Sequence, residues 1–276
     1  MKRPRVPAMS GVGVLSAVIA LAAQEPSFEV ASVKPNKSGD QKSASFVQPG
    51  GRYTATNVTL RMLVRSAYGV HDTQIVGGPN WINTDRFDIA AKAADSMPST
   101  AFRDQARLML RPLLTERFKL VLHRETREIP VYGLVLARGD RTFGPQFRRS
   151  DDTDCDVTDK SLPTAAGVAE PRPPLPCGAG FSWSGHIAGR LMELSMLVSS
   201  VSSWTDRVIL DRTALTGTFD WDLQWTQAPL AADIAAAPSG LSLFTAIQEQ
   251  LGLKLEGQRG SVDVLVIDSA SRPDPD

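Results

Sequence analysis

The apolar positions of this chain follow helical spacing in two stretches that lie 134 residues apart. In each stretch they fall at positions i, i+3, i+4 and i+7, which places them on one face of a short helix. Arg61 and Arg65 in the first stretch, and Ser195 and Ser199 in the second, occupy the opposite face. The apolar residues are Leu60, Leu63, Val64 and Ala67, and then Leu194, Leu197, Val198 and Val201. The pattern predicts two helices with the same register.

Partial alternation of apolar and polar residues follows each of these helices and predicts strands with one buried face. FDIAAKA begins at Phe87 and FDWDLQW at Phe219, so a Phe-Asp pair recurs in the same place. A second amphipathic stretch follows in each half and predicts a second helix. Its apolar stripe consists of Phe102, Ala106, Met109, Leu110 and Leu113 in the first half, and it lies in SLFTAIQEQLGL in the second.

Several residues mark where these helices begin, end or break. Asn57 or Thr59 is a candidate N-cap of the first helix, and Gly252 is placed to end the last one. Pro112 lies inside the second helix of the first half, where it removes a hydrogen bond and clashes with the preceding turn. The sequence therefore predicts either a kink at Pro112 or a new helix that begins near Arg111.

Each half ends in two apolar stretches separated by polar residues. These are FKLVLHRE and VYGLVLA in the first half, and LKLEGQ and VDVLVID in the second. We expect each pair to form adjacent antiparallel strands joined by a polar turn. The fold class that follows is α+β, with two tandem, internally repeated lobes, each with helices on one face of a small mixed sheet. The alternative is that two unrelated amphipathic stretches align loosely.

The length of 276 residues corresponds to one large domain or two ordinary ones. The stretch from about Gly139 to Phe181 has no helical period and is rich in Pro, Asp and Gly. We expect it to separate the lobes. The predicted boundaries are a signal peptide at 1–23, a first lobe at 24–140, a disulfide-bearing linker at 141–181, a second lobe at 182–270 and a disordered tail at 271–276.

The chain has two cysteines, Cys155 and Cys177, and both lie in the predicted linker. A disulfide between them would close a loop of about twenty residues and contribute roughly 3 kcal/mol in the loop-entropy treatment. The alternative, a metal or redox pair, lacks C-x-x-C spacing and has no histidine adjacent in sequence. We therefore predict a structural Cys155–Cys177 bridge.

The first residues resemble a secretory signal. Lys2, Arg3 and Arg5 precede a small, apolar stretch from Gly11 to Ala23 that is too short to span a bilayer. Cleavage near Ala23 predicts an exported protein, periplasmic or extracellular, without a stable membrane span. An uncleaved N-terminal anchor is the alternative.

Composition and charge exclude some classes of function. The hydrophobic fraction of 42% and the charged fraction of 22% are ordinary for a soluble protein. Lys and Arg together number 30, and so do Asp and Glu. This balance leaves no basic surface of the kind that nucleic acid requires, so we predict no nucleic-acid partner.

Several motifs together resemble a known family over nearly the whole chain after residue 23. They are FEVASVKPN, QPGGRYTATNVTLRMLVRSAYGV, IVGGPNWINTDRFDI, LLTERFKLVLHRETREIPVYGLVLARG, LTGTFDWDLQW and LFTAIQEQLGLKLE. The chain is similar to a large paralogous family of exported Acidobacterial proteins that is described as a domain of unknown function. The resemblance implies export and no established activity. A looser similarity links two stretches to the short N-terminal modules of secretins and TonB-dependent receptors, which contact other envelope proteins.

Catalytic patterns fail on named residues. In GFSWSG, Ser184 stands where the nucleophile elbow requires glycine. S-x-x-K, the P-loop and G-x-G-x-x-G do not occur. The acidic run from Asp151 to Asp159 lacks the glycine and the terminal glutamate of an EF-hand. The chain has only three histidines, which are His71, His123 and His186. We predict no catalytic, cofactor-binding or metal-binding residue.

Trp81 in GGPNWI is the candidate binding residue, as an aromatic anchor on a Gly-Pro turn. The alternative role is a core plug that holds this turn against the sheet. Trp204, Trp221 and Trp225 have the same two alternatives. The sequence favours a non-catalytic envelope or secreted module that binds a protein, a peptide or a cell-wall component. The alternative function is a hydrolase of unfamiliar architecture that uses histidine and carboxylate residues.

Overall fold

The first apolar stripe forms helix α1 (Leu60–Tyr68), and its four predicted core residues are buried. Thr59 is the N-cap, because its Oγ1 accepts a hydrogen bond from the backbone N–H of Met62 at 3.2 Å. Gly69 ends the helix at φ 63°, a left-handed conformation that glycine adopts without a steric penalty.

The structure is a computed structural model that describes residues 26–40, 42–94, 99–150, 175–226 and 240–274.

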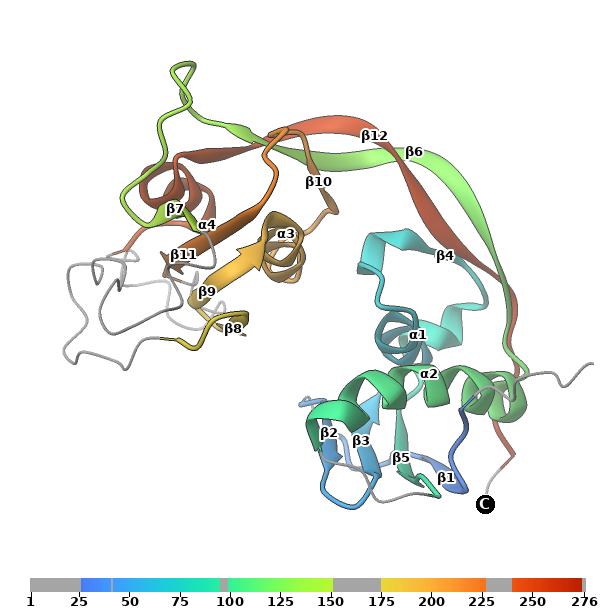
Figure 1. Cartoon of the computed structure of the whole chain (residues 1–276). Helices are drawn as coiled ribbons and strands as arrows, with labels where there is room; N and C mark the ends of the chain where they lie inside the picture. Colours follow the sequence, from blue (N-terminus) through green and yellow to red (C-terminus); the bar gives the residue numbers. More distant parts are fainter. Residues whose placement is uncertain (1–25, 41, 95–98, 151–174, 227–239, 275–276) are drawn as a thin grey trace, which may run out of the picture.

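The N-terminal lobe contains an antiparallel sheet in the order β1-β5-β3-β2. Helices α1 and α2 pack against one face of this sheet (Figure 1), and the five predicted stripe residues of α2 are buried. The bounds are β1 (Val30–Pro35), β2 (Ala44–Gln48), β3 (Arg52–Val58), η1 (Asp72–Gln74), β4 (Ile75–Gly77), η2 (Asn80–Asn83), β5 (Phe87–Lys92) and α2 (Ser99–Phe118).

The C-terminal lobe has the corresponding arrangement, with an antiparallel sheet in the order β7-β11-β9-β8. Helix α4 continues into the π-helical turn η4, and Gly252 at φ 68° ends it as predicted. The bounds are β7 (Phe147–Ser150), β8 (Ala179–Trp183), β9 (His186–Glu193), α3 (Leu194–Ser202), β10 (Ile209–Asp211), β11 (Thr218–Gln224), α4 (Leu243–Ala246) and η4 (Ile247–Leu251).

A long ribbon of two antiparallel strands, β6 (Val121–Leu136) and β12 (Leu253–Ser269), joins the lobes (Figure 1). The predicted hairpins within each half are therefore wrong. Each half contributes one continuous strand, and the partner strand comes from the other half. The polar residues Arg124–Glu128 are exposed on the surface of β6 and do not form a turn. The ribbon also pairs in parallel with β4 and β10, which completes a mixed sheet in the order β10-β6-β12-β4.

The ribbon contributes to the core of both lobes. Leu265 and Ile267 of β12 lie in the core of the N-terminal lobe, while Leu253 and Leu255 of the same strand lie in that of the C-terminal lobe. A third, smaller cluster in the ribbon itself contains the buried residues Val131, Val262 and Val264. The mixed sheet thus belongs to the ribbon, and the mixed sheets predicted inside the lobes are antiparallel sheets instead.

Other boundaries also differ from the sequence-based ones. Strand β7 lies within 141–181, the predicted linker, and β8 begins in it, yet both pair in the sheet of the C-terminal lobe. Helix α2 is continuous through Pro112, so no new helix begins near Arg111. Residues 271–274 of the predicted disordered tail are placed, because Arg272 pairs with Asp85 at 2.7 Å. The signal peptide at 1–23, residues 151–174 and residues 275–276 lie outside the described residues.

Both lobes contain a β-bulge in which one residue has a left-handed backbone. It is Asn57 (φ 56°) on β3 and Leu191 (φ 51°) on β9. The backbone N–H of each donates to the aspartate of the neighbouring Phe-Asp pair, Asp88 in one lobe and Asp220 in the other, at 2.8 Å in both. The recurring Phe-Asp pair therefore has a structural explanation: the aspartate satisfies an N–H that the bulge removes from the ladder.

Candidate functional site

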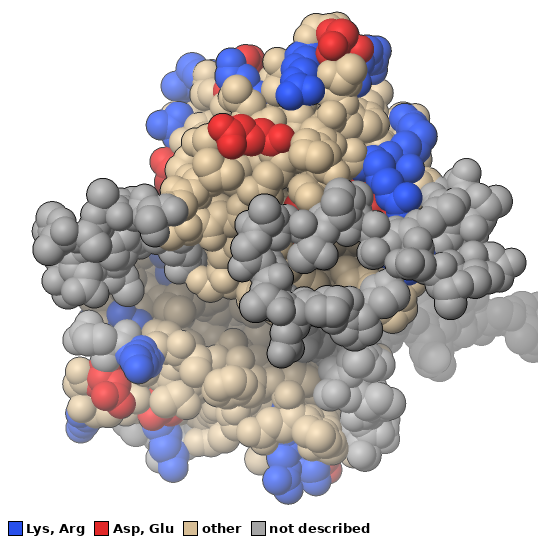
Figure 2. Space-filling model, turned by 90° about the vertical axis from the view of Figure 1, so that its left-hand side faces the viewer, with Lys and Arg blue, Asp and Glu red and all other residues tan. Residues whose placement is uncertain are grey.

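An open cleft of about 1120 Å³ separates the two lobes (Figure 2). Side chains of α1, α2 and η1 and the start of β2 line its N-terminal wall, while α3 and β10 line the C-terminal wall. The ribbon of β6 and β12 connects the two lobes (Figure 1). The volume of the cleft slightly exceeds the usual range of small-molecule pockets.

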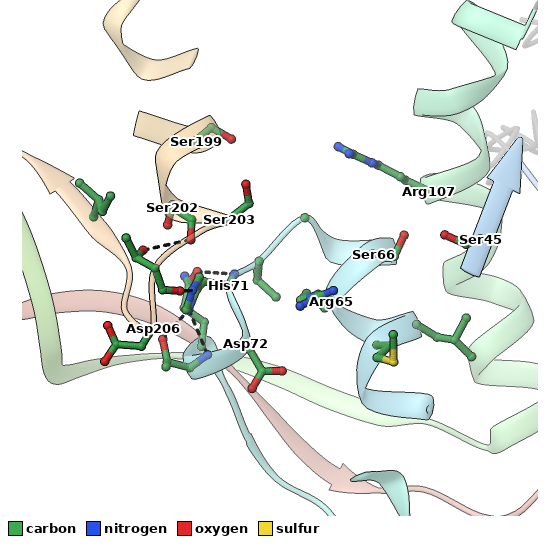
Figure 3. A pocket seen from close by; sticks show the side chains of 18 of the residues that line it. Ser45, Arg65, Ser66, His71, Asp72, Arg107, Ser199, Ser202, Ser203 and Asp206 are labelled. Atoms are coloured by element: carbon green, nitrogen blue, oxygen red, sulfur yellow. Dashed lines mark hydrogen bonds between the residues drawn. The ribbon is translucent and has the colours of Figure 1, made fainter. Parts of the chain in front are cut away.

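His71 joins the two walls at the base of the cleft (Figure 3). Its Nδ1 accepts from the backbone N–H of Thr73 at 3.3 Å and lies 2.8 Å from the Thr73 hydroxyl. The proton of the neutral ring is therefore on Nε2, which donates to the carbonyl oxygen of Thr205 at 3.1 Å. Both ring nitrogens are thus engaged in holding the loop after α1 against the loop after α3.

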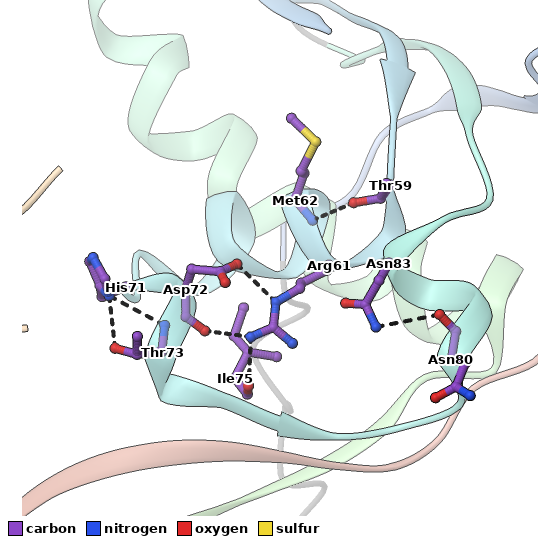
Figure 4. Close-up of polar contacts among 9 residues, drawn as sticks. All are labelled: Thr59, Arg61, Met62, His71, Asp72, Thr73, Ile75, Asn80 and Asn83. Carbon is purple, nitrogen blue, oxygen red and sulfur yellow. Dashed lines mark hydrogen bonds and ion pairs between the residues drawn. The ribbon is translucent and has the colours of Figure 1, made fainter. Parts of the chain in front are cut away.

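The loop that carries His71 is itself fixed to α1 (Figure 4). Arg61 donates to the carboxylate of Asp72 at 2.8 Å and to the carbonyl oxygens of Asp72 and Ile75 at 2.6 and 2.9 Å. The Gln74 side chain accepts from the backbone N–H of His71 at 2.9 Å, which completes a capping box. These contacts position the base of the cleft before any ligand arrives.

The three acidic residues of the cleft already have partners. Asp206 accepts a hydrogen bond from the Tyr132 hydroxyl at 3.0 Å, and burial together with this bond raises the Tyr132 pKa. Asp211 accepts from the backbone and the hydroxyl of Thr213 at 2.8 and 2.7 Å. Asp72 pairs with Arg61. Within the described residues, each carboxylate is therefore satisfied without a ligand.

Two arginines of the cleft differ from its acidic residues, because their charged groups have no partner among the described residues. Arg65 of α1 and Arg107 of α2 are exposed, and no described residue forms a hydrogen bond or an ion pair with either guanidinium. The opposite wall carries the hydroxyls of Ser195, Ser199 and Ser202 on α3. Figure 3 shows both arginines extending from the N-terminal lobe toward the side where α3 lies. The cleft thus places cationic donors opposite neutral hydroxyl groups.

Tyr53 of β3 belongs to the N-terminal wall of the cleft and is almost fully buried. Burial raises the pKa of its hydroxyl from 10.0 to about 12, while a hydrogen bond with Ser45 opposes the shift. Because the pKa is higher in the folded state than in the unfolded chain, the folded state holds this proton more tightly. The associated stabilisation is complete below pH 10 and is lost as pH rises toward 12.

We therefore expect the free energy of unfolding to fall by about 1.4 kcal/mol between pH 9 and pH 11 through Tyr53 alone. Urea titrations at both pH values measure this loss. In Tyr53→Phe the contribution is absent, so the fall between the two pH values should be smaller by that amount. An identical fall in both proteins would show that Tyr53 is not the group responsible.

The structure distributes the three histidines over different elements. His123 lies exposed on the ribbon, 2.9 Å from Asp268, and His186 on β9 lies 3.0 Å from Asp222. Neither lines the cleft, and His71, which does, contacts threonine groups through both ring nitrogens. Among the described residues, no three potential metal ligands gather in one place.

Trp81 on η2 does not line the cleft. Its ring stacks on Phe118 at 6.5 Å between centroids, meets Phe87 edge-on at 6.3 Å, and has the Arg272 guanidinium 5.3 Å from its centroid. These contacts favour the role of a plug, and binding by Trp81 stays an untested prediction. Trp221 is buried, and Trp204 and Trp225 pack edge-on at 5.7 Å.

The predicted Cys155–Cys177 bridge stays a prediction, because Cys155 and the acidic run 151–159 lie outside the described residues. Sequence reasoning placed Arg65 and Ser199 on the polar faces of their helices but did not identify them as parts of a site. The signal available was that both polar faces occur at the same register of two helices with the same apolar pattern. No sequence pattern marked Arg107 as part of a site.

No helix among the described residues is both long and apolar enough to cross a membrane.

Comparison with known proteins gives one family match. No curated protein and no solved structure matches the chain. Residues 61–270, which include α3, the whole ribbon and all of α1 except Leu60, match a family described as "Protein of unknown function (DUF3738)". The match covers most of the chain, and the chain therefore belongs to this family of proteins of unknown function.

Proposed function

We propose that this protein is a non-catalytic binding module that holds its ligand in the cleft between the two lobes. The observation that carries the proposal is the cleft itself, about 1120 Å³ in volume and lined by polar side chains of both lobes. Clefts at domain interfaces are the usual sites of ligand binding. The N-terminal sequence supports export, so we place this activity in the periplasm or outside the cell.

The alternative function, a hydrolase, has less support. A base that activates a serine needs a ring nitrogen free to accept the hydroxyl proton. His71 is the histidine of the cleft, and Thr73 and Thr205 occupy its two nitrogens. The His123–Asp268 and His186–Asp222 pairs are the arrangements that would favour an enzyme, but both lie outside the cleft lining.

We further propose that the two lobes are copies of one ancestral unit. The sheet orders β1-β5-β3-β2 and β7-β11-β9-β8 place corresponding strands at corresponding positions. Left-handed residues also recur at matching places, with Gly51 and Gly185 before β3 and β9, and Lys119 and Gly252 before the two ribbon strands. On this view, the cleft lies between two equivalent surfaces, each built around the first helix of its lobe.

A variant with an obstructed cleft tests the proposed function. Ser199→Trp places an indole on the exposed face of α3, inside the cleft. We expect compounds from a chemically diverse library to raise the melting temperature of the unmodified protein by roughly 5 to 10 °C at 100 times their Kd. The same compounds should leave Ser199→Trp unshifted in differential scanning fluorimetry.

The matched control is Ser261→Trp, which adds the same side chain to an exposed position of the ribbon strand β12. It should respond to each compound as the unmodified protein does. A library in which no compound acts on the unmodified protein, or in which Ser199→Trp responds equally, would contradict binding in the cleft.

A further inference from the structure

The charge on the two walls of the cleft is uneven. Arg65 and Arg107 come from different helices, α1 and α2, and both extend into the space between the lobes (Figure 3). As noted above, neither guanidinium has a partner among the described residues. An arginine presents five N–H donors and stays charged at any physiological pH. Two such groups on one wall form an unfilled set of donors for an oxyanion.

The acidic groups that line the cleft do not neutralise Arg65 and Arg107. Asp72 is neutralised by Arg61, and Asp211 is satisfied by Thr213. Asp206 accepts from a tyrosine and has the Arg207 guanidinium 3.5 Å away. The acidic groups therefore have structural partners in or beside the loops, whereas the two arginines of the wall do not.

The facing wall is suited to the remainder of such a ligand. Helix α3 presents Ser199 and Ser202, whose hydroxyls have no hydrogen-bond partner among the described residues. A hydroxyl donates and accepts equally well, so this wall accommodates polar groups without repelling an anion. The size of the cleft also exceeds what a bare ion fills, which favours a ligand of several linked units.

We propose that the cleft binds an anionic ligand, with its carboxylate or phosphate oxygens held by Arg65 and Arg107 and its polar remainder against the hydroxyls of α3. This inference rests on the proposed function and names the chemical class of the ligand. The two arginines set the orientation, since each oxyanion accepts charge-assisted hydrogen bonds from a guanidinium.

Isothermal titration with defined peptides tests this inference. The probes are tetraglutamate, the uncharged tetraglutamine and inorganic phosphate. We expect tetraglutamate to bind the unmodified protein and tetraglutamine to bind at least tenfold more weakly. Arg65→Gln and Arg107→Gln should each weaken tetraglutamate binding about tenfold, because each removes charge-assisted contacts. Phosphate that competes with tetraglutamate would identify the oxyanion alone as the recognised group, and phosphate that does not would identify the carboxylate-bearing chain.

The matched control is Arg124→Gln, which removes one positive charge from an exposed position of β6 outside the cleft. It should bind tetraglutamate like the unmodified protein, and all three variants should keep the same melting temperature. Failure of both tetraglutamate and phosphate to bind would overturn the inference, and so would binding that ignores Arg65→Gln and Arg107→Gln. The Ser199→Trp experiment with uncharged compounds would then decide separately whether the cleft binds any ligand.

Discussion

Replacing Asp220 by alanine is expected to lower the free energy of unfolding by about 3 to 5 kcal/mol. Asp220 is only 3% exposed, and its two carboxylate oxygens have different tasks. One accepts the backbone N–H of Leu191 at the bulge of β9, at 2.8 Å, and the other receives the guanidinium of Arg148 from β7. Alanine removes one charged acceptor from the partly buried Arg148 guanidinium and leaves the bulge N–H without its acceptor. Urea unfolding followed by circular dichroism measures the loss.

Two further variants separate these contributions. Asp220→Asn keeps an oxygen for the N–H of Leu191 but removes the charge opposite Arg148, so its loss should be smaller than that of alanine. Asp88→Ala, at the matching position of the N-terminal lobe, removes bonds to the N–H of Asn57 and to the neutral amide of Asn36. Because no cation loses an acceptor there, we expect a loss of about 1 to 3 kcal/mol. A loss for Asp220→Ala below that for Asp88→Ala would refute the ranking.

The parts of the fold that local pattern determines were predictable from the sequence. The i, i+3, i+4, i+7 stripes of α1 and α3 are buried at all positions except Val198, which is partly buried. The recurrence of the Phe-Asp pair also marked a real feature, although its reason, the bulge that the aspartate satisfies, required coordinates. These features depend on neighbours within one strand or helix turn, which a pattern can report.

The ribbon could not be predicted in this way. In β6, apolar residues occur near both ends, where the strand joins the core of each lobe, and charged residues occur between them at Arg124–Glu128. A short polar stretch between two apolar ones has the same pattern in a hairpin turn and in a strand that crosses between two cores. Pairing over some 130 residues of sequence separation decides between them, and local pattern contains no information on such pairing.

The cleft was missed for a related reason. Arg65, Arg107 and Ser199 lie on the polar faces of ordinary amphipathic helices, which in most proteins face bulk water. They become parts of one site only because the ribbon places the two lobes opposite each other. The sequence offers His71 as a candidate for catalytic chemistry. In the structure, its hydrogen bond to Thr205 connects the two lobes instead. A site made of two lobes depends on their arrangement, and each stretch of sequence describes one lobe alone.

Phe118→Ala is expected to cost about 3 to 5 kcal/mol of unfolding free energy. The Phe118 ring is 0% exposed, meets Phe87 edge-on at 5.1 Å and stacks on Trp81 at 6.5 Å. Alanine leaves a cavity at the point where α2 passes into the ribbon, and Trp81 loses the packing that orders its turn. Guanidinium unfolding followed by tryptophan fluorescence measures the change, and Phe46→Ala, at a ring that is 60% exposed, is the control with an expected loss below about 0.5 kcal/mol.

The same titration tests whether the ribbon couples the two lobes. Trp81 is the one tryptophan of the N-terminal lobe, and the other four of the chain belong to the C-terminal lobe: Trp183, Trp204, Trp221 and Trp225. Because β12 contributes Leu265 to one core and Leu253 to the other, melting of the N-terminal lobe removes half of a strand that the C-terminal core needs. Phe118→Ala should therefore shift the fluorescence transition of the distant tryptophans together with the circular dichroism transition. A fluorescence midpoint equal to that of the unmodified protein would mean that the lobes unfold independently and that the ribbon connects them without coupling their unfolding.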